Sequence, residues 1–335
     1  MPSFQLSPGV LIDPDRLEAY VMSPQGGIVA VDLAEGTPVW HSSDADKPLT
    51  VAGTLLIGQA EAPGPGDALR IVTLDTSRRG EQVSEAVVGL PPGVQPMIAP
   101  SLNRSFAASA RAEPEGAVVS WEFVERPARG VADGPMEVLP GEAPPAATAA
   151  TPPVTGPGAI PAGAIDAPEP GGAATVVRGG ARVDPLSGTV TATEEPVMPA
   201  PGPPPVSAGD SAPASDLEPG AALPGVSQPQ FLSADGRHVL SSIRVANDPD
   251  WDKYLWTIFE RDSGRRAGEL RMHLRYVPFL VAGMRVIFQT PPYARRQGEE
   301  IFQEPLLLRA ADLDTGTPVW SQPVRDTVDR EPPPP

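Results

Sequence analysis

A short acidic run in the second half of the chain has the residue spacing of a metal-binding loop. Asp248, Asp250 and Asp252 lie at alternate positions. Alternate carboxylates in a loop can converge on a hard cation such as Ca²⁺, which binds oxygen ligands. The run departs from the EF-hand template, because Lys253 stands where that loop needs Gly and Phe259 where it needs the bidentate Glu. Two interpretations follow: a calcium site at these three aspartates, or an ordinary solvated acidic turn.

The same run contains Trp251, which lies outside the repeats described below. A Trp in a polar loop is a typical anchor residue for protein partners, because it buries a large apolar area. Trp251 is therefore the candidate partner-binding residue.

Other residue types that support catalysis do not form a recognisable pattern. The three histidines, His41, His238 and His273, share no spacing that would bring them to one metal, and we expect them in different sheets. There is no cysteine, no Gly-x-Ser-x-Gly elbow and no Gly-rich phosphate loop followed by Lys. We therefore predict no catalytic and no cofactor-binding residue, although strands distant in sequence could assemble a site in a central channel.

Composition and charge limit the possible partners. The net charge is -17 and no stripe of Lys and Arg offsets it, which argues against a nucleic-acid partner. No uncharged apolar run reaches about 18 residues, so no membrane-spanning helix is expected. The absence of cysteine and of an apolar segment behind a basic N-terminus favours the cytoplasm.

The strongest structural signal is a repeated segment. Asp32–Trp40 returns as Asp312–Trp320, with differences only at the two positions between Leu and Gly. In each copy a short alternating strand ends in Asp, turns through Gly and leaves as Thr-Pro-Val-Trp, which predicts a hairpin. The Asp carboxylate can accept backbone N–H groups, Gly supplies a positive φ, and Trp offers an apolar plate to a neighbouring sheet.

Weaker copies of this hairpin lie between the two. They are Val72–Ser77, Trp256–Gly264 and the more divergent Val183–Gly188. The predicted structural residues of the repeat are Asp32, Gly36, Trp40, Asp262, Gly264, Asp312, Gly316 and Trp320. Where the spacing is regular, the turns recur about every 40 to 50 residues, which is the period of a four-stranded propeller blade.

With Ala310 before it, the Asp312–Trp320 copy resembles the repeat of quinoprotein-like (pyrroloquinoline quinone repeat-like) β-propellers, Ala-x-Asp-x-x-Thr-Gly-x-x-x-Trp. The resemblance implies an all-β fold, a β-propeller of about 5–7 four-stranded blades. Members that bind the quinone carry a calcium site, an acidic base and often a vicinal disulfide, which this cysteine-free chain cannot form. The resemblance thus implies the non-catalytic branch, whose propellers are scaffolds for protein contacts.

The composition divides the chain into segments. We expect the first blades in residues 1–133, a partial blade or hairpin in 172–195 and the last blades in 225–325. Residues 134–171 and 196–224 are rich in Pro, Ala and Gly and are predicted to be disordered inserts, with a disordered tail in 326–335. The segment Phe4–Ile12 is expected to pair with the last blade and close the ring.

Two functions are compatible with these features. The first is a non-catalytic propeller scaffold that binds a protein partner through one face or through the Pro-rich inserts. The alternative is a propeller enzyme or sensor that binds a quinone or sugar-like ligand in the axial channel with calcium.

Overall fold

The computed structural model describes residues 3–7, 9–61, 68–101, 103–114, 116–126, 174–192, 222–247, 252–297 and 300–326. In these ranges the chain is all-β, with one short 3₁₀ turn, η1 (Thr76–Arg78), as its helical element. The predicted insert 134–171, the tail beyond residue 326 and most of the insert 196–224 lie outside the described residues.

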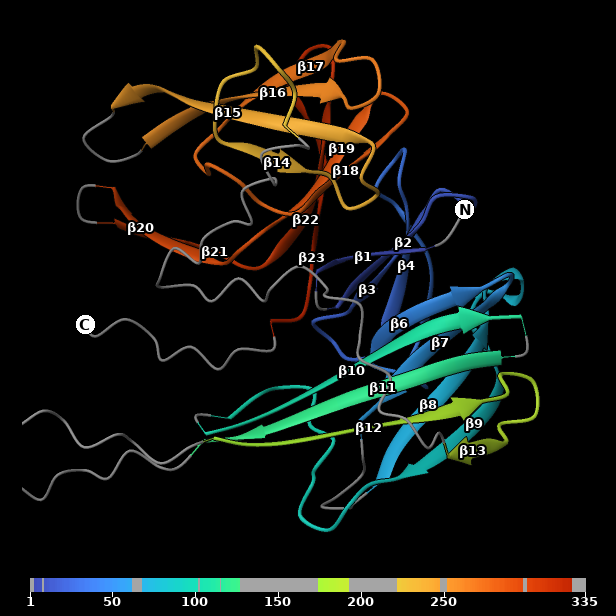
Figure 1. Cartoon of the computed structure of the whole chain (residues 1–335). Helices are drawn as coiled ribbons and strands as arrows, with labels where there is room; N and C mark the ends of the chain where they lie inside the picture. Colours follow the sequence, from blue (N-terminus) through green and yellow to red (C-terminus); the bar gives the residue numbers. More distant parts are fainter. Residues whose placement is uncertain are drawn as a thin grey trace, which may run out of the picture.

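The described strands form five antiparallel sheets of four or five strands, numbered here in chain order, and one two-stranded sheet (Figure 1). Sheet 1 contains β1 (Phe4–Ser7), β2 (Val10–Asp13), β3 (Glu18–Met22), β4 (Ile28–Asp32) and β5 (Pro38–Ser42). Sheet 2 contains β6 (Lys47–Ala52), β7 (Leu55–Ala60), β8 (Ala68–Asp75) and β9 (Glu81–Gly89). Sheet 3 contains β10 (Arg104–Glu113), β11 (Gly116–Glu125), β12 (Thr175–Val183) and β13 (Val190–Ala192).

The last two sheets follow residue 222. Sheet 4 contains β14 (Gln230–Leu232), β15 (His238–Asn247), β16 (Asp252–Glu260) and β17 (Arg266–Met272). Sheet 5 contains β18 (Phe279–Ala282), β19 (Arg285–Thr290), β22 (Leu307–Asp312) and β23 (Pro318–Pro323). A separate hairpin of β20 (Tyr293–Gln297) and β21 (Glu300–Glu304) extends from sheet 5 between β19 and β22.

The sheets pack face to face because their strands are apolar on both sides. Successive side chains of a strand point to opposite faces, so on β7 Leu56 joins the apolar cluster with sheet 1 while Ile57 joins the cluster with sheet 3. Further clusters join sheet 1 to sheet 5 and sheet 5 to sheet 4. The spatial order of the described sheets is therefore 3–2–1–5–4, an arc in which the first and last parts of the chain lie at the centre (Figure 1).

One hairpin turn recurs in sheets 1, 3, 4 and 5. The amide of its Gly donates to the carbonyl of an acidic residue four positions earlier, and the amide of that acidic residue donates to the carbonyl five positions later. The acidic residues are Asp32, Asp184, Glu260 and Asp312. In sheet 2 the corresponding turn is one residue longer and runs from Asp75 to Gly80. The divergent copy Val183–Gly188 thus has the same backbone geometry as the two close copies.

At four junctions between neighbouring described sheets, the Gly of such a turn lies against the neighbouring sheet. A Cβ built on Gly36 of sheet 1 would lie 2.2 Å from Trp320 of sheet 5, and one on Gly80 of sheet 2 would lie 2.5 Å from Trp40 of sheet 1. Gly188 of sheet 3 meets the backbone of Glu85 in sheet 2 in the same way, and Gly316 of sheet 5 meets Glu269 in sheet 4. The turn of sheet 5 thus packs on sheet 4, that of sheet 1 on sheet 5, that of sheet 2 on sheet 1 and that of sheet 3 on sheet 2.

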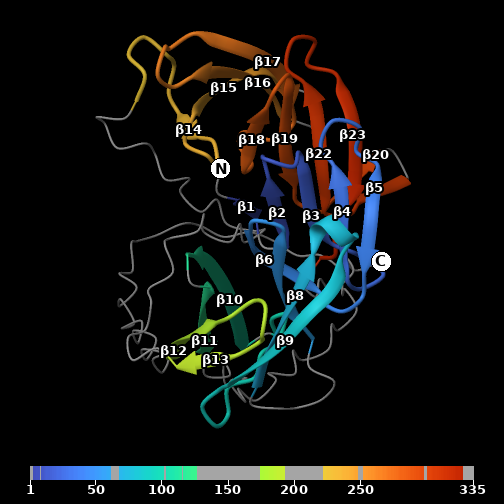
Figure 2. The same cartoon turned by 90° about the vertical axis from the view of Figure 1, so that its right-hand side faces the viewer.

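The remaining junction, from sheet 3 to sheet 4, is not made by the described residues. A Cβ on Gly264, the turn glycine of sheet 4, would have nothing within 4 Å, and no apolar cluster of described residues joins these two sheets. Figure 2 shows β10 to β13 and β14 to β17 at opposite ends of the arc.

One sequence prediction needs correction here. Phe4–Ile12 does not form a closing strand on the last blade: it folds into the β1–β2 hairpin of sheet 1, because Gly9 has φ +87° and permits the reversal. Sheets 1 and 5 are joined by side chains instead, with Leu6 in one cluster with Leu280 and Ile287. The segment 172–195 supplies β12 and β13, which complete a four-stranded sheet with β10 and β11.

Candidate functional site

The predicted calcium loop lies largely outside the described residues. Asp248, Asp250 and Trp251 are not described, and Asp252 is placed only as the first residue of β16, opposite Asn247. Among the described residues, no three His, Asp or Glu side chains are grouped in a way that could bind a metal ion. Calcium binding at these aspartates and partner binding by Trp251 therefore remain predictions.

The turn residues of the repeat are held by the expected type of contact. Asp32 Oδ1 accepts the amides of Ala34 and Glu35, both at 2.8 Å, and Asp312 Oδ1 accepts those of the equivalent residues Asp314 and Thr315. These backbone hydrogen bonds hold the pKa of Asp312 below its ordinary value.

In sheet 4 the corresponding acidic position is occupied by Glu260, two residues before the predicted Asp262. The amide of Gly264 donates to the carbonyl of Glu260, as Gly316 does to Asp312. Hydrogen bonds from Arg265 and Ser263 lower the pKa of the Glu260 carboxyl to about 2. Asp262 was predicted because it is the Asp nearest to Gly264, whereas Glu260 occupies the acidic position of the turn.

The histidines do not converge, but two of them belong to one sheet. His41 lies on β5, where its Nε2 is 2.9 Å from the carbonyl oxygen of Gly26. His238 begins β15 and His273 follows β17, so both belong to sheet 4, contrary to the expectation of different sheets. Burial lowers the pKa of His238.

The most distinctive surface is the face of sheet 4 that would meet sheet 3, called here the open face. Its side chains come from the positions of β15, β16 and β17 opposite to the face that packs on sheet 5: Val239, Ser241, Ile243, Lys253, Leu255, Thr257, Phe259, Glu269 and Arg271, while Val245 lies at a bulge of β15. Ile243 and Val245 are 44% and 45% exposed. Paired apolar side chains of a sheet normally pack on a core, so their exposure here marks an uncovered surface.

The open face carries charges of both signs. Lys253 and Arg271 are both exposed, and the one carboxylate among these positions, Glu269, is ion-paired with Arg266 at 2.6 Å. The whole chain carries a net charge of -17.

The edge of β15 that pairs with β14 is only partly paired by the described strands. β14 pairs with Val239, Leu240 and Ser241, and no described strand continues that pairing along Ser242–Asn247. Ser242 is 3% exposed, and its Oγ has no hydrogen-bond partner. A strand edge of this kind presents backbone N–H and C=O groups that can pair with another chain.

The end of the open face next to β14 is covered by the chain that enters the sheet. Gln230 Oε1 accepts the amide of Leu223 at 2.8 Å, and Gln230 Nε2 donates to the carbonyls of Leu223 and Val226. Ser241 Oγ donates to the carbonyl of Ser227 at 2.8 Å. Residues 222–224 of the predicted insert therefore belong to a defined turn, and the apolar surface beyond it is the part left exposed.

The outward face of sheet 3 is of a different kind. Glu122 Oε2 accepts a hydrogen bond from Arg178 at 2.5 Å, and Glu113 is paired with Arg182 at 2.9 Å. Burying such pairs against an apolar sheet would remove their hydration, which costs more than the pairing returns unless every group is satisfied. Sheet 3 is thus a poor cover for the open face of sheet 4.

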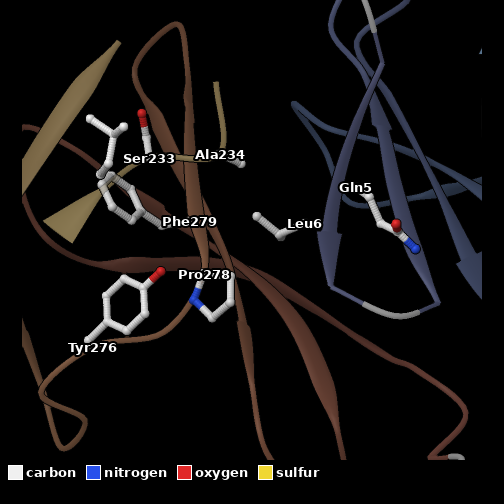
Figure 3. A pocket seen from close by; sticks show the side chains of 8 residues that line it. Gln5, Leu6, Ser233, Ala234, Tyr276, Pro278 and Phe279 are labelled. Atoms are coloured by element: carbon white, nitrogen blue, oxygen red, sulfur yellow. The ribbon is translucent and has the colours of Figure 1, made fainter. Parts of the chain in front are cut away.

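A small cavity lies where β1, β14 and β18 approach one another, and Figure 3 shows its lining. It holds about 190 Å³ and is lined by Gln5, Leu6, Leu232, Ser233, Ala234, Tyr276, Pro278 and Phe279. Ser233 Oγ is occupied, since it donates to Asp235 and accepts the amide of His238. Tyr276 stacks on Phe231 with ring centroids 4.4 Å apart, and burial raises the pKa of its hydroxyl.

Lys47 is a further residue that the sequence did not single out. It lies on β6 of sheet 2, at the interface with sheet 3, and its Nζ is 3.5 Å from the carbonyl oxygen of Ala108 on β10. Burial lowers its pKa to about 8. One of only two lysines in the chain is thus placed where its charge is poorly solvated.

Comparisons with known proteins show no family. No protein-family profile and no curated protein sequence match the chain. Among solved structures it is similar to TolB from Acinetobacter baumannii, with 15% identity over 93% of this chain and 52% of that one and a TM-score of 0.25. A europium-containing methanol dehydrogenase matches at 12% identity over 94% and 68%, with a TM-score of 0.22. A quinohemoprotein alcohol dehydrogenase from Comamonas testosteroni matches at 10% over 92% and 58%, with a TM-score of 0.21.

The chain thus spans about half the length of TolB, and similarities at this level concern the arrangement of sheets alone. In the part of the chain that the structure describes, no helix is long and apolar enough to cross a membrane.

Proposed function

We propose that this protein is a non-catalytic, quinoprotein-like β-propeller scaffold that binds another protein through the open face of sheet 4. The five described sheets are its blades. The observation that carries the proposal is the contrast between Gly264, which has nothing within 4 Å, and the turn glycines of the other four blades, each of which packs on a neighbour.

The physical argument rests on what the other junctions require. Trp40, Trp121, Trp256 and Trp320 each belong to a different interface between blades, so those interfaces bury large apolar areas and hold the blades rigidly. The open face presents side chains of the same kind at the one interface that described residues leave unmade. A rigid, exposed apolar surface with a charged rim is typical of a protein-binding site.

Affinity purification from the cells that produce the protein, followed by native mass spectrometry, tests this function. We expect a polypeptide bound in a defined ratio to the wild-type chain, and none bound to an unrelated acidic propeller carrying the same tag. Recovery of the chain alone, or with only a small molecule bound, would count against a scaffold.

The second candidate is a small-molecule sensor or enzyme with a quinone or sugar-like ligand and calcium near the propeller axis. The cavity lined by Gln5, Ser233 and Tyr276 favours it, because inner strands of three blades meet there (Figure 3). Its volume of about 190 Å³ is below the roughly 300 Å³ at which ordinary ligand pockets begin. A ligand smaller than a quinone cofactor fits this cavity better.

A further inference from the structure

We propose that the interface between sheets 2 and 3 binds a small monovalent anion, of the size of chloride, between Lys47 Nζ and Gln59 Nε2. The site is separate from the open face of sheet 4 and from the cavity lined by Tyr276, so the inference goes beyond the proposed function. Two observations carry it: a largely buried ammonium group that no described carboxylate neutralises, and a buried amide donor that no described acceptor satisfies.

The strand pairing brings the two donors together. Lys47 on β6 is paired directly with Gln59 on β7, so both side chains leave the same face of sheet 2, with Cβ atoms about 4.5–5.5 Å apart. On this face Ile57, two residues before Gln59, packs against sheet 3. β6 and β10 lie side by side at the interface (Figure 1), and Lys47 Nζ reaches across it to the carbonyl oxygen of Ala108.

Lys47 needs a negative partner. Of its three N–H donors, one faces the Ala108 carbonyl at 3.5 Å, which is long for a hydrogen bond. Burial lowers the pKa of Lys47 to about 8, so the side chain is still mainly protonated at pH 7. A charge removed from water is costly unless an opposite charge compensates it.

The acidic residues on either side of this strand pair are engaged elsewhere. The Asp46 carboxylate accepts the amide of Gly27 at 3.2 Å and that of Glu61 at 2.8 Å. Arg325 is paired with Asp46 at 3.7 Å and with Glu61 at 3.3 Å. Within the described ranges, neither carboxylate forms an ion pair with Lys47, so its counter-ion has to come from solution.

Gln59 selects an anion over a water molecule. The residue is 1% exposed, and its Nε2 has no hydrogen-bond partner in the part of the chain that the structure describes. A buried N–H group without an acceptor is destabilising. Water would satisfy this donor but leave Lys47 charged, whereas an anion accepts from both groups and neutralises the charge.

The surroundings limit the charge and size of the anion. Ile57 and Ala108 belong to the apolar cluster between the two sheets, so the ion has to lose most of its hydration on binding. That loss is least costly for a weakly hydrated monovalent ion and prohibitive for sulfate or phosphate. Chloride is therefore the expected ligand.

The chain contains a matched control in sheet 5. Gln289 on β19 is equivalent to Gln59, since each lies four residues after the position that pairs with the turn aspartate of its sheet, Asp312 or Asp75. The Nε2 of Gln289 is also buried without a hydrogen-bond partner among the described residues. Its amide faces the carbonyl of Pro278 on the inner side of the sheet, where sheet 2 has the lysine.

Urea denaturation at pH 7 and constant ionic strength tests the proposal, with sodium gluconate replaced stepwise by sodium chloride. If the dissociation constant is about 10 mM, 100 mM chloride should raise the wild-type ratio of folded to unfolded protein about tenfold. Lys47→Met and Gln59→Met should lose this increase, and Gln289→Met should keep it. In gluconate Lys47→Met should be more stable than wild type, and chloride should narrow the difference.

A measurement on the wild-type chain covers the case in which the variants do not fold. Crystals soaked in bromide should show an anomalous difference peak beside Lys47 Nζ and Gln59 Nε2, because bromide has the charge of chloride and nearly its size. The same crystals should show no peak beside Gln289.

Three results overturn the inference. The first is an equal effect of chloride on wild type and Lys47→Met, which would make the effect a general one of salt. The second is loss of the chloride effect in Gln289→Met as well as in Gln59→Met. The third is a bromide map without a peak at Lys47, or one with an ordered water molecule there instead. A peak in the crystal without any chloride effect in solution identifies an adventitious ion only and also overturns it.

Discussion

Gly36 in the turn of the first sheet lies against the indole of Trp320 in the last sheet, so closely that a Cβ on Gly36 would come within 2.2 Å of Trp320 Cγ. Trp320 Nε1 also donates to the carbonyl of Leu33 at 3.1 Å, and the amide of Arg325 donates to the carbonyl of Met22 at 2.9 Å. This junction joins the two ends of the chain. The junction that the described residues leave unmade, between sheets 3 and 4, lies in the middle of the sequence instead.

A pair of glycine substitutions tests whether Gly36 packs against Trp320 at the junction of sheets 1 and 5. Gly36→Ala and Gly264→Ala both place a side chain at positive φ, +73° and +66°, which costs about 1–2 kcal/mol each. Gly36→Ala should lose a further ~1–3 kcal/mol, because its Cβ overlaps Trp320. Urea denaturation should show this difference, and equal losses would contradict the packing of Gly36 under Trp320.

The junction between sheets 1 and 5 should hold a cut chain together. A protease site introduced near residue 210, between β13 and β14, would separate sheets 1–3 from sheets 4 and 5 in sequence. We expect the two fragments to co-elute in size exclusion, since the cluster that includes Leu6 and Leu280 spans the two parts. Trp320→Ala should promote their separation, because the partly buried Trp320 side chain packs on the cluster that joins sheets 1 and 5. Free separation of the wild-type fragments would contradict the arrangement.

Because of Lys47, the free energy of unfolding should rise with pH in the alkaline range. Its folded pKa of about 8 lies below the ordinary 10.5 because of burial, so the unfolded chain binds more protons between these values and stability rises with pH across that range. Lys47→Met should raise the free energy of unfolding at pH 7 by on the order of 2 kcal/mol. The variant should also lack the increase in the free energy of unfolding that Lys47 causes in the wild type between pH 8 and pH 10. Parallel pH profiles for the two proteins would show that Lys47 is solvated.

The calcium prediction is tested by melting temperature. If Asp248, Asp250 and Asp252 bind the ion, millimolar Ca²⁺ should raise the melting temperature, because a ligand that binds only the folded state stabilises it. The triple Asp→Asn variant should lose this shift while keeping the wild-type melting temperature in chelator. An unchanged wild-type melting temperature on adding Ca²⁺ would leave the acidic turn as the interpretation.

Local chemistry made part of the architecture predictable. The alternation of apolar residues and the Asp–Gly–Trp spacing predicted β-strands and hairpins, because a strand and its turn depend on residues that are neighbours in sequence. Trp40 and Trp320 were expected between sheets for the same reason: a large apolar plate at a hairpin end must be buried somewhere.

Other assignments failed because the backbone, and not the residue type, defines the position. Glu260 takes the place given to Asp262, since the carbonyl that Gly264 reaches belongs to residue 260 whatever its side chain. Phe4–Ile12 was expected on the last blade, but the reversal at Gly9 keeps it in its own sheet. His238 and His273 share sheet 4 because β15 and β17 both pair with β16, which their separation in sequence does not indicate.

The sequence by itself determined the local elements of this protein: where strands run, where they turn, and that large aromatic side chains end the best-matched hairpins. Only the tertiary structure decided which sheet covers which, and so which face is left uncovered. Ile243 and Val245 have the same apolar alternation as residues buried elsewhere, and nothing in their neighbours along the chain distinguishes them. Their exposure depends on whether another sheet lies opposite, and that is a long-range property of packing.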